Sequence, residues 1–154
     1  MRTFIATALT GAVMSTLVVG QTPASIQRQE IQAFVRSYVD AVNRSDLTSY
    51  VDMYARTPEL ITISSGEITR GWEAIRNEAN QMMGTEGAYR ISPGIVEVMS
   101  LGPTRALALL PFVATVNTDR GTIQLRGAMS LIVEKTPEGW KIIHDHTSTA
   151  TPGT

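Results

Sequence analysis

The residue types best suited to chemistry lie near the end of the chain, in residues 140–148 (WKIIHDHTS). Successive side chains of a β-strand point to opposite faces, so His144 and His146 are predicted to share one face with Trp140. Asp145 is then expected on the opposite face. Because histidine exchanges protons near neutral pH, this pair could form a polar, titratable site.

The neighbouring strand decides which groups lie beside these histidines. If the turn pairs Glu134 with Trp140, the histidine face also carries Arg126, Ala128 and Ser130; a slip of one residue would present Gly127, Met129 and Leu131 instead. An arginine beside imidazoles could hold a carboxylate through charge-assisted hydrogen bonds. The first pairing therefore predicts a ligand pocket, with these candidate residues: His144, His146, Arg126, Ser130, and the covering aromatic residues Tyr38, Tyr54 and Trp72.

Two interpretations of these groups remain open. The histidines could be satisfied by hydrogen bonds within a core, and the aromatic residues could serve packing alone, with partners for their polar tips. A metal site needs a third ligand, but the sequence has no other histidine and Asp145 is expected to point away. We therefore predict no metal and no cofactor. The sequence also lacks a nucleophile elbow, a phosphate loop and a dinucleotide motif.

Hydrophobic spacing predicts the elements that position these groups. Apolar residues at steps of three and four indicate amphipathic helices over residues 25–43, 47–54 and 72–82. Thr22-Pro23 is typical of a helix start, and Ser45 or Asp46 could cap the second helix. Short β-type runs follow at residues 60–63, 95–101, 105–118, 122–135 and 140–147.

The last four of these runs are joined by short turns, which favours antiparallel pairing and an α+β domain. Residues 106–116 are apolar at both odd and even positions, so both faces of their strand must be shielded from water. Pro111 within this run indicates a bulge or an edge position. A partner subunit is the simplest second cover. We therefore predict a homodimer through the convex face of the sheet, with Leu131, Val133 and Ile143 contributing.

The composition sets the class of protein. The chain has 154 residues, 43% of them hydrophobic and 18% charged, with a net charge of −1, which argues for one folded domain and against a nucleic-acid binder. Residues 1–20, possibly to 24, resemble a secretory signal, with Arg2 before an apolar stretch. The expected product is a secreted or periplasmic domain over residues 25–150, with no membrane contact beyond the signal; an uncleaved anchor is the alternative.

Three segments in order suggest a family: residues 41–47 (AVNRSDL), 66–75 (GEITRGWEAI) and 139–148 (GWKIIHDHTS). Together they resemble the SnoaL-like branch of the nuclear transport factor 2-like superfamily, and are similar to the association domain of calcium/calmodulin-dependent kinase II. The resemblance implies a cone-shaped, curved antiparallel sheet with about three helices on its concave face. It also implies that the His-x-His face lines the cone, and that an arginine usually stands where this chain has Ala128.

The resemblance does not imply one activity, since this fold serves isomerases, hydrolases, cyclases and plain assembly modules. Steroid isomerases of this fold use buried carboxylates, and residues 60–63 and 106–116 hold none. Two functions are therefore expected to compete. One is a pocket for a small apolar or carboxylate ligand, catalytic or not; the other is a homo-oligomeric assembly or interaction module with a vestigial pocket.

Overall fold

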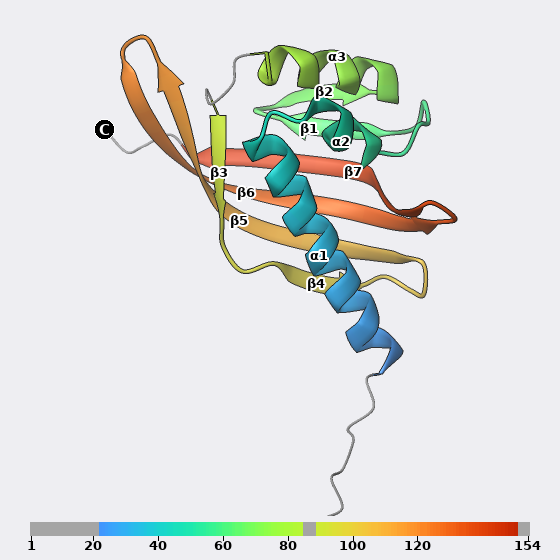
Figure 1. Ribbon diagram of the computed structural model, residues 1–154. Helices are drawn as coiled ribbons and strands as arrows, with labels where there is room; N and C mark the ends of the chain where they lie inside the picture. Colours follow the sequence, from blue (N-terminus) through green and yellow to red (C-terminus); the bar gives the residue numbers. More distant parts are fainter. Residues whose placement is uncertain (1–21, 85–88, 151–154) are drawn as a thin grey trace, which may run out of the picture.

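A computed structural model describes residues 22–84 and 89–150 of the chain. They form a curved seven-stranded sheet that does not close, with three helices on its concave face (Figure 1). The predicted α+β cone is confirmed. The export segment predicted over residues 1–20 lies outside the described residues. Among the helices that are described, none is long and apolar enough to span a bilayer.

The helices are α1 (Pro23–Asn43), α2 (Leu47–Asp52) and α3 (Trp72–Met82). They begin where the sequence predicts. Thr22 caps α1, its Oγ1 accepting a hydrogen bond from the Ser25 N–H at 3.2 Å. Asp46 caps α2 by accepting one from the Ser49 N–H at 3.0 Å. These side chains satisfy main-chain donors that would otherwise be unpaired in the first turn.

The strands are β1 (Ile61–Ser64), β2 (Glu67–Arg70), β3 (Tyr89–Pro93), β4 (Glu97–Ser100), β5 (Arg105–Thr118), β6 (Gly121–Thr136) and β7 (Gly139–Ala150). Their order is β2-β1-β7-β6-β5-β3, and β4 also pairs with β5. The antiparallel meander β5-β6-β7 matches the prediction. The sequence pattern does not indicate β2, β3 or the parallel pairing of β1 with β7.

A gap between the edge strands β3 and β4 explains why β5 tolerates a proline at position 111. On one side β5 pairs continuously with β6, and on the other it pairs with β4 up to Leu109 and with β3 from Phe112. Pro111 lies between these two pairings, so no partner strand there requires the main-chain N–H that proline lacks. Its carbonyl still accepts a hydrogen bond from the Gly94 N–H at 2.7 Å.

A β-bulge in β7 changes which side chains enter the cone. Ile142 pairs with Val133 and His144 with Ile132, so Ile143 is an extra residue without a partner in β6. An extra residue shifts the alternation of the strand beyond it. Trp140 and Ile142 point inward before the bulge, as predicted, but after it Asp145 is buried and His146 is exposed. The predicted orientation of this histidine–aspartate segment is therefore wrong.

The same pattern corrects the predicted convex face. Leu131 and Val133 are fully buried on the concave side, beneath the helices, and do not face outward. The convex side of the sheet instead carries partly exposed apolar side chains: Met99, Leu107, Leu109, Pro111, Val113, Ile132 and Ile143.

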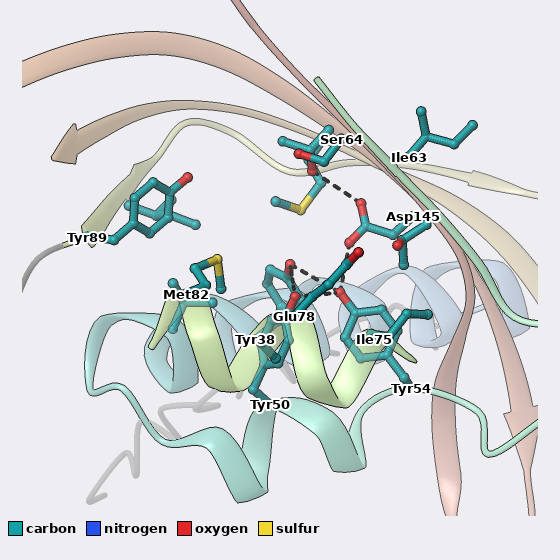
Figure 2. Close-up of a pocket in the computed structure, with 16 residues that line it drawn as sticks. Tyr38, Tyr50, Tyr54, Ile63, Ser64, Ile75, Glu78, Met82, Tyr89 and Asp145 are labelled. Carbon is teal, nitrogen blue, oxygen red and sulfur yellow. Dashed lines mark hydrogen bonds between the residues drawn. The ribbon is translucent and has the colours of Figure 1, made fainter. Parts of the chain in front are cut away.

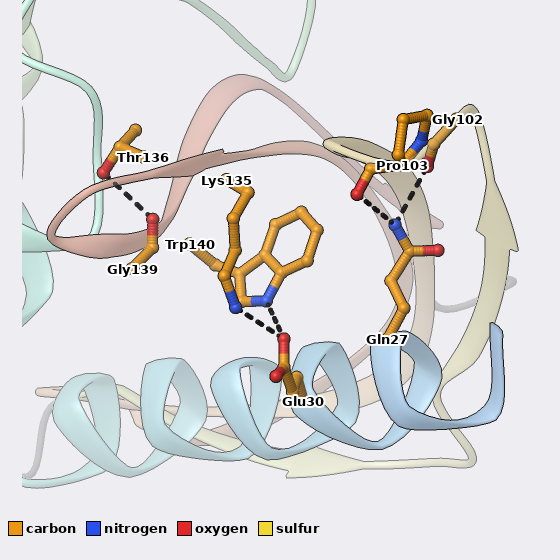
Figure 3. Close-up of polar contacts among 8 residues, drawn as sticks. All are labelled: Gln27, Glu30, Gly102, Pro103, Lys135, Thr136, Gly139 and Trp140. Carbon is orange, nitrogen blue, oxygen red and sulfur yellow. Dashed lines mark hydrogen bonds and ion pairs between the residues drawn. The ribbon is translucent and has the colours of Figure 1, made fainter. Parts of the chain in front are cut away.

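Side-chain hydrogen bonds at two places hold α1 against the sheet. At its end, the Asn43 side chain donates to the Ile91 carbonyl at 2.9 Å and accepts from the Ile91 N–H at 2.7 Å, which ties the helix to the edge strand β3. Nearer its start, Glu30 accepts hydrogen bonds from Lys135 at 2.6 Å and from the Trp140 indole at 2.9 Å (Figure 3). The second contact joins α1 to the β6–β7 hairpin.

Replacing Glu30 with glutamine is expected to lower the free energy of unfolding by about 0.5 to 1 kcal/mol at pH 7, because Glu30 and Lys135 are partly exposed and solvent screens them. The hydrogen bond from Lys135 keeps the pKa of Glu30 below its ordinary value. A lowered pKa means that this stabilisation is lost as the pH falls through it. The difference between wild type and variant should therefore shrink in urea titrations run at acidic pH. A difference that grew with acid would contradict this prediction.

Candidate functional site: a tyrosine-lined cavity with one buried carboxyl group

A cavity of about 180 Å³ lies between the concave face of the sheet and the three helices (Figure 2). Its apolar wall includes Ile75 and Ala79 from α3, and Met129 from β6. Its polar groups are tyrosines from three elements, hydroxyls of β1 and β7, Glu78 and Asp145. Such a mixture of apolar wall and few convergent polar groups is typical of small-molecule sites.

Asp145 is the only charged side chain that is buried in the described part of the chain, with 5% of its surface exposed. One carboxylate oxygen accepts a hydrogen bond from the Tyr54 hydroxyl at 2.8 Å, and the other accepts one from Thr147 at 3.2 Å. Burial raises the pKa of Asp145, and these two hydrogen bonds and the nearby His144 only partly oppose that effect. The cavity therefore holds a buried carboxyl group whose protonated form is favoured more than in an exposed aspartate.

Tyr54 owes its position to the main chain on either side of it. The Ala55 N–H donates to the Ile142 carbonyl at 2.9 Å, and the Ile142 N–H donates to the Met53 carbonyl at 2.8 Å. Residues 53–55 thus pair with β7 just before the bulge, and β1 pairs with it just after. The bulge brings Asp145 under the hydroxyl of a tyrosine that the same strand anchors.

Three tyrosines form a hydrogen-bonded chain that ends at Asp145 (Figure 2). The Tyr50 and Tyr54 hydroxyl oxygens are 2.9 Å apart, and the Tyr38 hydroxyl lies 3.4 Å from each of them. Each hydroxyl has one proton, and that of Tyr54 goes to Asp145. Tyr50 must then donate to Tyr54, and Tyr38 to Tyr50, so every proton in the chain is directed toward the carboxylate.

The tyrosines themselves are held neutral. Burial, followed by the negative charge of Asp145, raises the pKa of Tyr50 to about 12. Burial and the charge of Asp145 are also the main causes that raise the pKa of Tyr54. For Tyr38 the main causes of the raised pKa are burial and the neighbouring Tyr50. Burial and Asp145 also raise the pKa of Tyr89, across the cavity from this chain. Near neutral pH these four side chains act only as hydroxyl donors and acceptors.

The structure brings together only part of the predicted ligand site. Tyr38 and Tyr54 line the cavity. His144 and His146 lie on the other face of β7, where His146 pairs with Ser130 and is exposed. Arg126 is exposed and pairs with Ala150 at the far end of β6. The predicted pairing of Glu134 with Trp140 is wrong, because Lys135 pairs with Trp140. The bulge then shifts the alternation by one residue, so Ser130 and Arg126 do share the histidine face, but that face is the convex one.

Trp72 also lies away from the cavity. Its indole N–H donates to the Val51 carbonyl at 3.0 Å, and the Arg56 and Arg76 guanidinium groups lie 4.8 and 5.4 Å from its ring centre. It lines a shallow surface depression beside the start of α3. Its contacts are those of a residue that anchors α2 and α3 together.

The sequence analysis missed Asp145, Tyr50 and Tyr89 as cavity residues. Strict alternation placed Asp145 outside, and the signal that could have corrected it is the apolar pair Ile142-Ile143, which interrupts the inside–outside pattern. Tyr50 lies at the helical spacing of Tyr54, one turn earlier, so the spacing already placed both on one face. Tyr89 lies on β3, a strand that the sequence analysis did not predict.

The chain belongs to the SnoaL-like domain family, which it matches over residues 31–152. This match agrees with the cone fold and with the resemblance noted in the sequence. No curated protein matches the chain.

Solved structures share the fold. A nuclear transport factor 2-like superfamily protein from Salmonella enterica is 26% identical, with a TM-score of 0.71, covering 84% of this chain and 96% of that one. A "Putative Scytalone Dehydratase" from Novosphingobium aromaticivorans is 11% identical, with a TM-score of 0.74 and coverages of 84% and 87%. A "Putative calcium/calmodulin dependent protein kinase II association domain" from Xanthomonas campestris is 19% identical, with a TM-score of 0.70 and coverages of 92% and 100%.

Proposed function

We propose that this protein binds a small molecule inside the cone, and that Asp145 exchanges a proton with that molecule. The observation that carries the proposal is a buried carboxyl group, at the end of a tyrosine hydrogen-bond chain, facing a cavity. Burying an ionisable group costs stability, so such groups occur most often where function requires them. Acid–base catalysis of an isomerisation or a dehydration is the chemistry that this group could perform.

The volume of the cavity limits the size of the ligand. An apolar cavity of about 150 Å³ is enough to hold benzene. The cavity here, at about 180 Å³, therefore suits a molecule of one ring or a short branched chain.

A thermal-shift screen with one-ring compounds tests this proposal. A compound that binds only the native state stabilises it by RT ln(1 + L/Kd), where L is the free ligand concentration, so the melting temperature rises with the logarithm of the ligand concentration above Kd. Ala79→Leu, which adds bulk to the wall of the cavity, is the matched variant and should abolish the shift. Ala74→Leu on the same helix, outside the cavity lining, is the control and should preserve it. Ligands whose shift survives Ala79→Leu would bind elsewhere and contradict a site in the cone.

The convex face favours a second function, assembly into a homodimer, which is compatible with the first. Apolar side chains from β4, β5, β6 and β7 lie together there, and Leu109 at the centre of β5 keeps 38% of its surface exposed. Stable interfaces bury roughly 1,600 Å² in total, and a two-fold pair is the commonest arrangement. The supporting observation is this exposed apolar surface on the convex side of the sheet.

Leu109→Glu is expected to convert a dimer into a monomer, because it would place two like charges in a desolvated interface. Analytical ultracentrifugation across micromolar concentrations measures the result. Ile68→Glu on the edge strand β2, where the side chain is 52% exposed, is the matched control and should leave the dimer intact. Wild-type protein that sediments as a monomer at high concentration would exclude this assembly.

Export also remains part of the proposal. Its support is the pattern of Arg2 followed by an apolar stretch in residues 1–20. The mass of protein recovered from the periplasm or medium should correspond to a chain that begins near residue 21. Full-length protein confined to the cytoplasm would contradict it.

A further inference from the structure

The cavity has carboxyl groups but no basic side chain in its described lining. The residues that line it include two acids, Asp145 and Glu78, and among these described residues there is no lysine, arginine or histidine. Glu78 lies on α3, is exposed, and accepts a hydrogen bond from Thr69 on β2. One acid is therefore inside the cavity and the other is exposed to solvent beside it.

The hydroxyl protons already in the cavity are committed. In the chain from Tyr38 to Asp145, each proton is directed toward the carboxylate, so these hydroxyls cannot also donate to a ligand anion. The carboxylate accepts one hydrogen bond at each oxygen, although two carboxylate oxygens offer about four acceptor positions. The described lining still offers the neutral hydroxyls of Thr62, Ser64 and Tyr89, but it holds no positively charged donor.

We propose that the natural ligand or substrate of the cavity carries a protonated amine, on a body of about one ring, and that the ammonium group pairs with Asp145. This inference rests on the proposed small-molecule function and names its ligand class. The ammonium would fill the free acceptor positions of Asp145, and the apolar wall of Ile75, Ala79 and Met129 would cover the ring. A carboxylate ligand would instead meet a like charge without a compensating cation.

Burial makes this pairing strong. Opposite charges interact far more strongly in a desolvated site than in water, and Asp145 has already lost its hydration in the folded protein. Glu78 would contribute a weaker attraction because solvent screens it. The four tyrosines around the cavity add hydroxyl oxygens and aromatic rings, both of which favour a bound cation.

Four one-ring probes of similar size test the inference on the wild-type protein: benzylamine, its isostere benzyl alcohol, toluene and benzoate. Their binding is measured by calorimetry at pH 7.5 and low salt. Benzylamine is expected to bind at least about tenfold more tightly than benzyl alcohol or toluene, a difference of 1.4 kcal/mol or more, and benzoate is expected not to bind. Equal affinity for the alcohol, or any preference for benzoate, would overturn the amine inference while leaving a small-molecule cavity in place. Failure of all four probes would count against the inference and the proposed function together.

Variants then assign the preference to particular charges. Asp145→Asn keeps the shape of the side chain and should abolish the preference for benzylamine over benzyl alcohol. Glu78→Gln, at an exposed position that does not endanger folding, should weaken benzylamine by roughly two- to threefold and leave the alcohol unchanged. Glu73→Gln, five residues earlier on α3, outside the cavity lining and paired with Arg76, is the matched control and should change neither. An amine preference that survives Asp145→Asn would show that the cation binds elsewhere.

Discussion

Gly127→Ala is expected to lower the free energy of unfolding by about 3 kcal/mol, the upper part of the usual range for overpacking. A Cβ atom at position 127 would lie 2.4 Å from the end of the Phe112 ring and 2.8 Å from the Ser148 carbonyl oxygen. Phe112 is buried and stands directly opposite Gly127 across the β5–β6 pair. Contacts this short cannot both persist, so the ring and the β7 main chain must shift to admit the methyl group.

Urea denaturation measures the loss, and a double-mutant cycle apportions it. In a Phe112→Leu background the alanine should cost less, because the ring contact is gone, but some cost should remain from the Ser148 carbonyl. Gln124→Ala, at an exposed position on the same strand, should change stability by no more than about 0.5 kcal/mol. A cost below about 1 kcal/mol for Gly127→Ala would show that the packing described here is looser than the distances indicate.

Asp145→Asn is expected to raise the free energy of unfolding by about 1 to 2 kcal/mol at pH 7.5, in the absence of ligand. Burial raises the pKa of Asp145 in the folded protein, so ionisation of that carboxyl group weakens the native state as the pH rises through the raised pKa. Asparagine does not ionise. Its carbonyl can still accept from Tyr54, and its amide can donate to the Thr147 hydroxyl.

The difference in stability between the variant and the wild type is expected to depend on pH. Below the ordinary pKa of an aspartate both states of the wild type are protonated, so the advantage of the variant should nearly vanish near pH 3.5. It should then increase as the pH rises. Chemical denaturation of both proteins at several pH values measures the difference. An asparagine variant that is less stable than the wild type at pH 7.5 would show that the buried carboxylate is fully compensated by its neighbours.

Most of the fold could be predicted because its signals are local. The apolar stripe of α1, the Thr22 and Asp46 caps and the turns between long strands each depend on neighbours within a few residues, and the structure has them where expected. The strands that were missed are short and lie at sheet edges. β2 exposes Ile68, and β3 is held partly by the distant Asn43 side chain. Neither feature produces a periodic pattern that the sequence alone reveals.

The site was predicted only where helical spacing applied. Tyr38 and Tyr54 lie on helical faces or just beyond them, and burial of those faces brought them to the cavity. The strand residues were placed wrongly because one extra residue reverses the alternation, and the apolar pair Ile142-Ile143 hints at the interruption without showing which residue is the extra one. The convex face was misassigned at Leu131 and Val133 because a strand with apolar residues on both sides does not indicate which side the helices cover.

The bulge at Ile143 also bears on how relatives of this protein should be aligned. An ungapped alignment with a sequence whose last strand is regular would match inward residues of one protein to outward residues of the other beyond this point. His144 would then be equated with a residue that lines the neighbour's cavity, and Asp145 with one on its surface. A single-residue gap at Ile143 restores the structural correspondence. Cavity residues should therefore be matched between members of this family by superposing their strands. Two histidines that share a column of a sequence alignment in this strand can lie on opposite faces of the sheet.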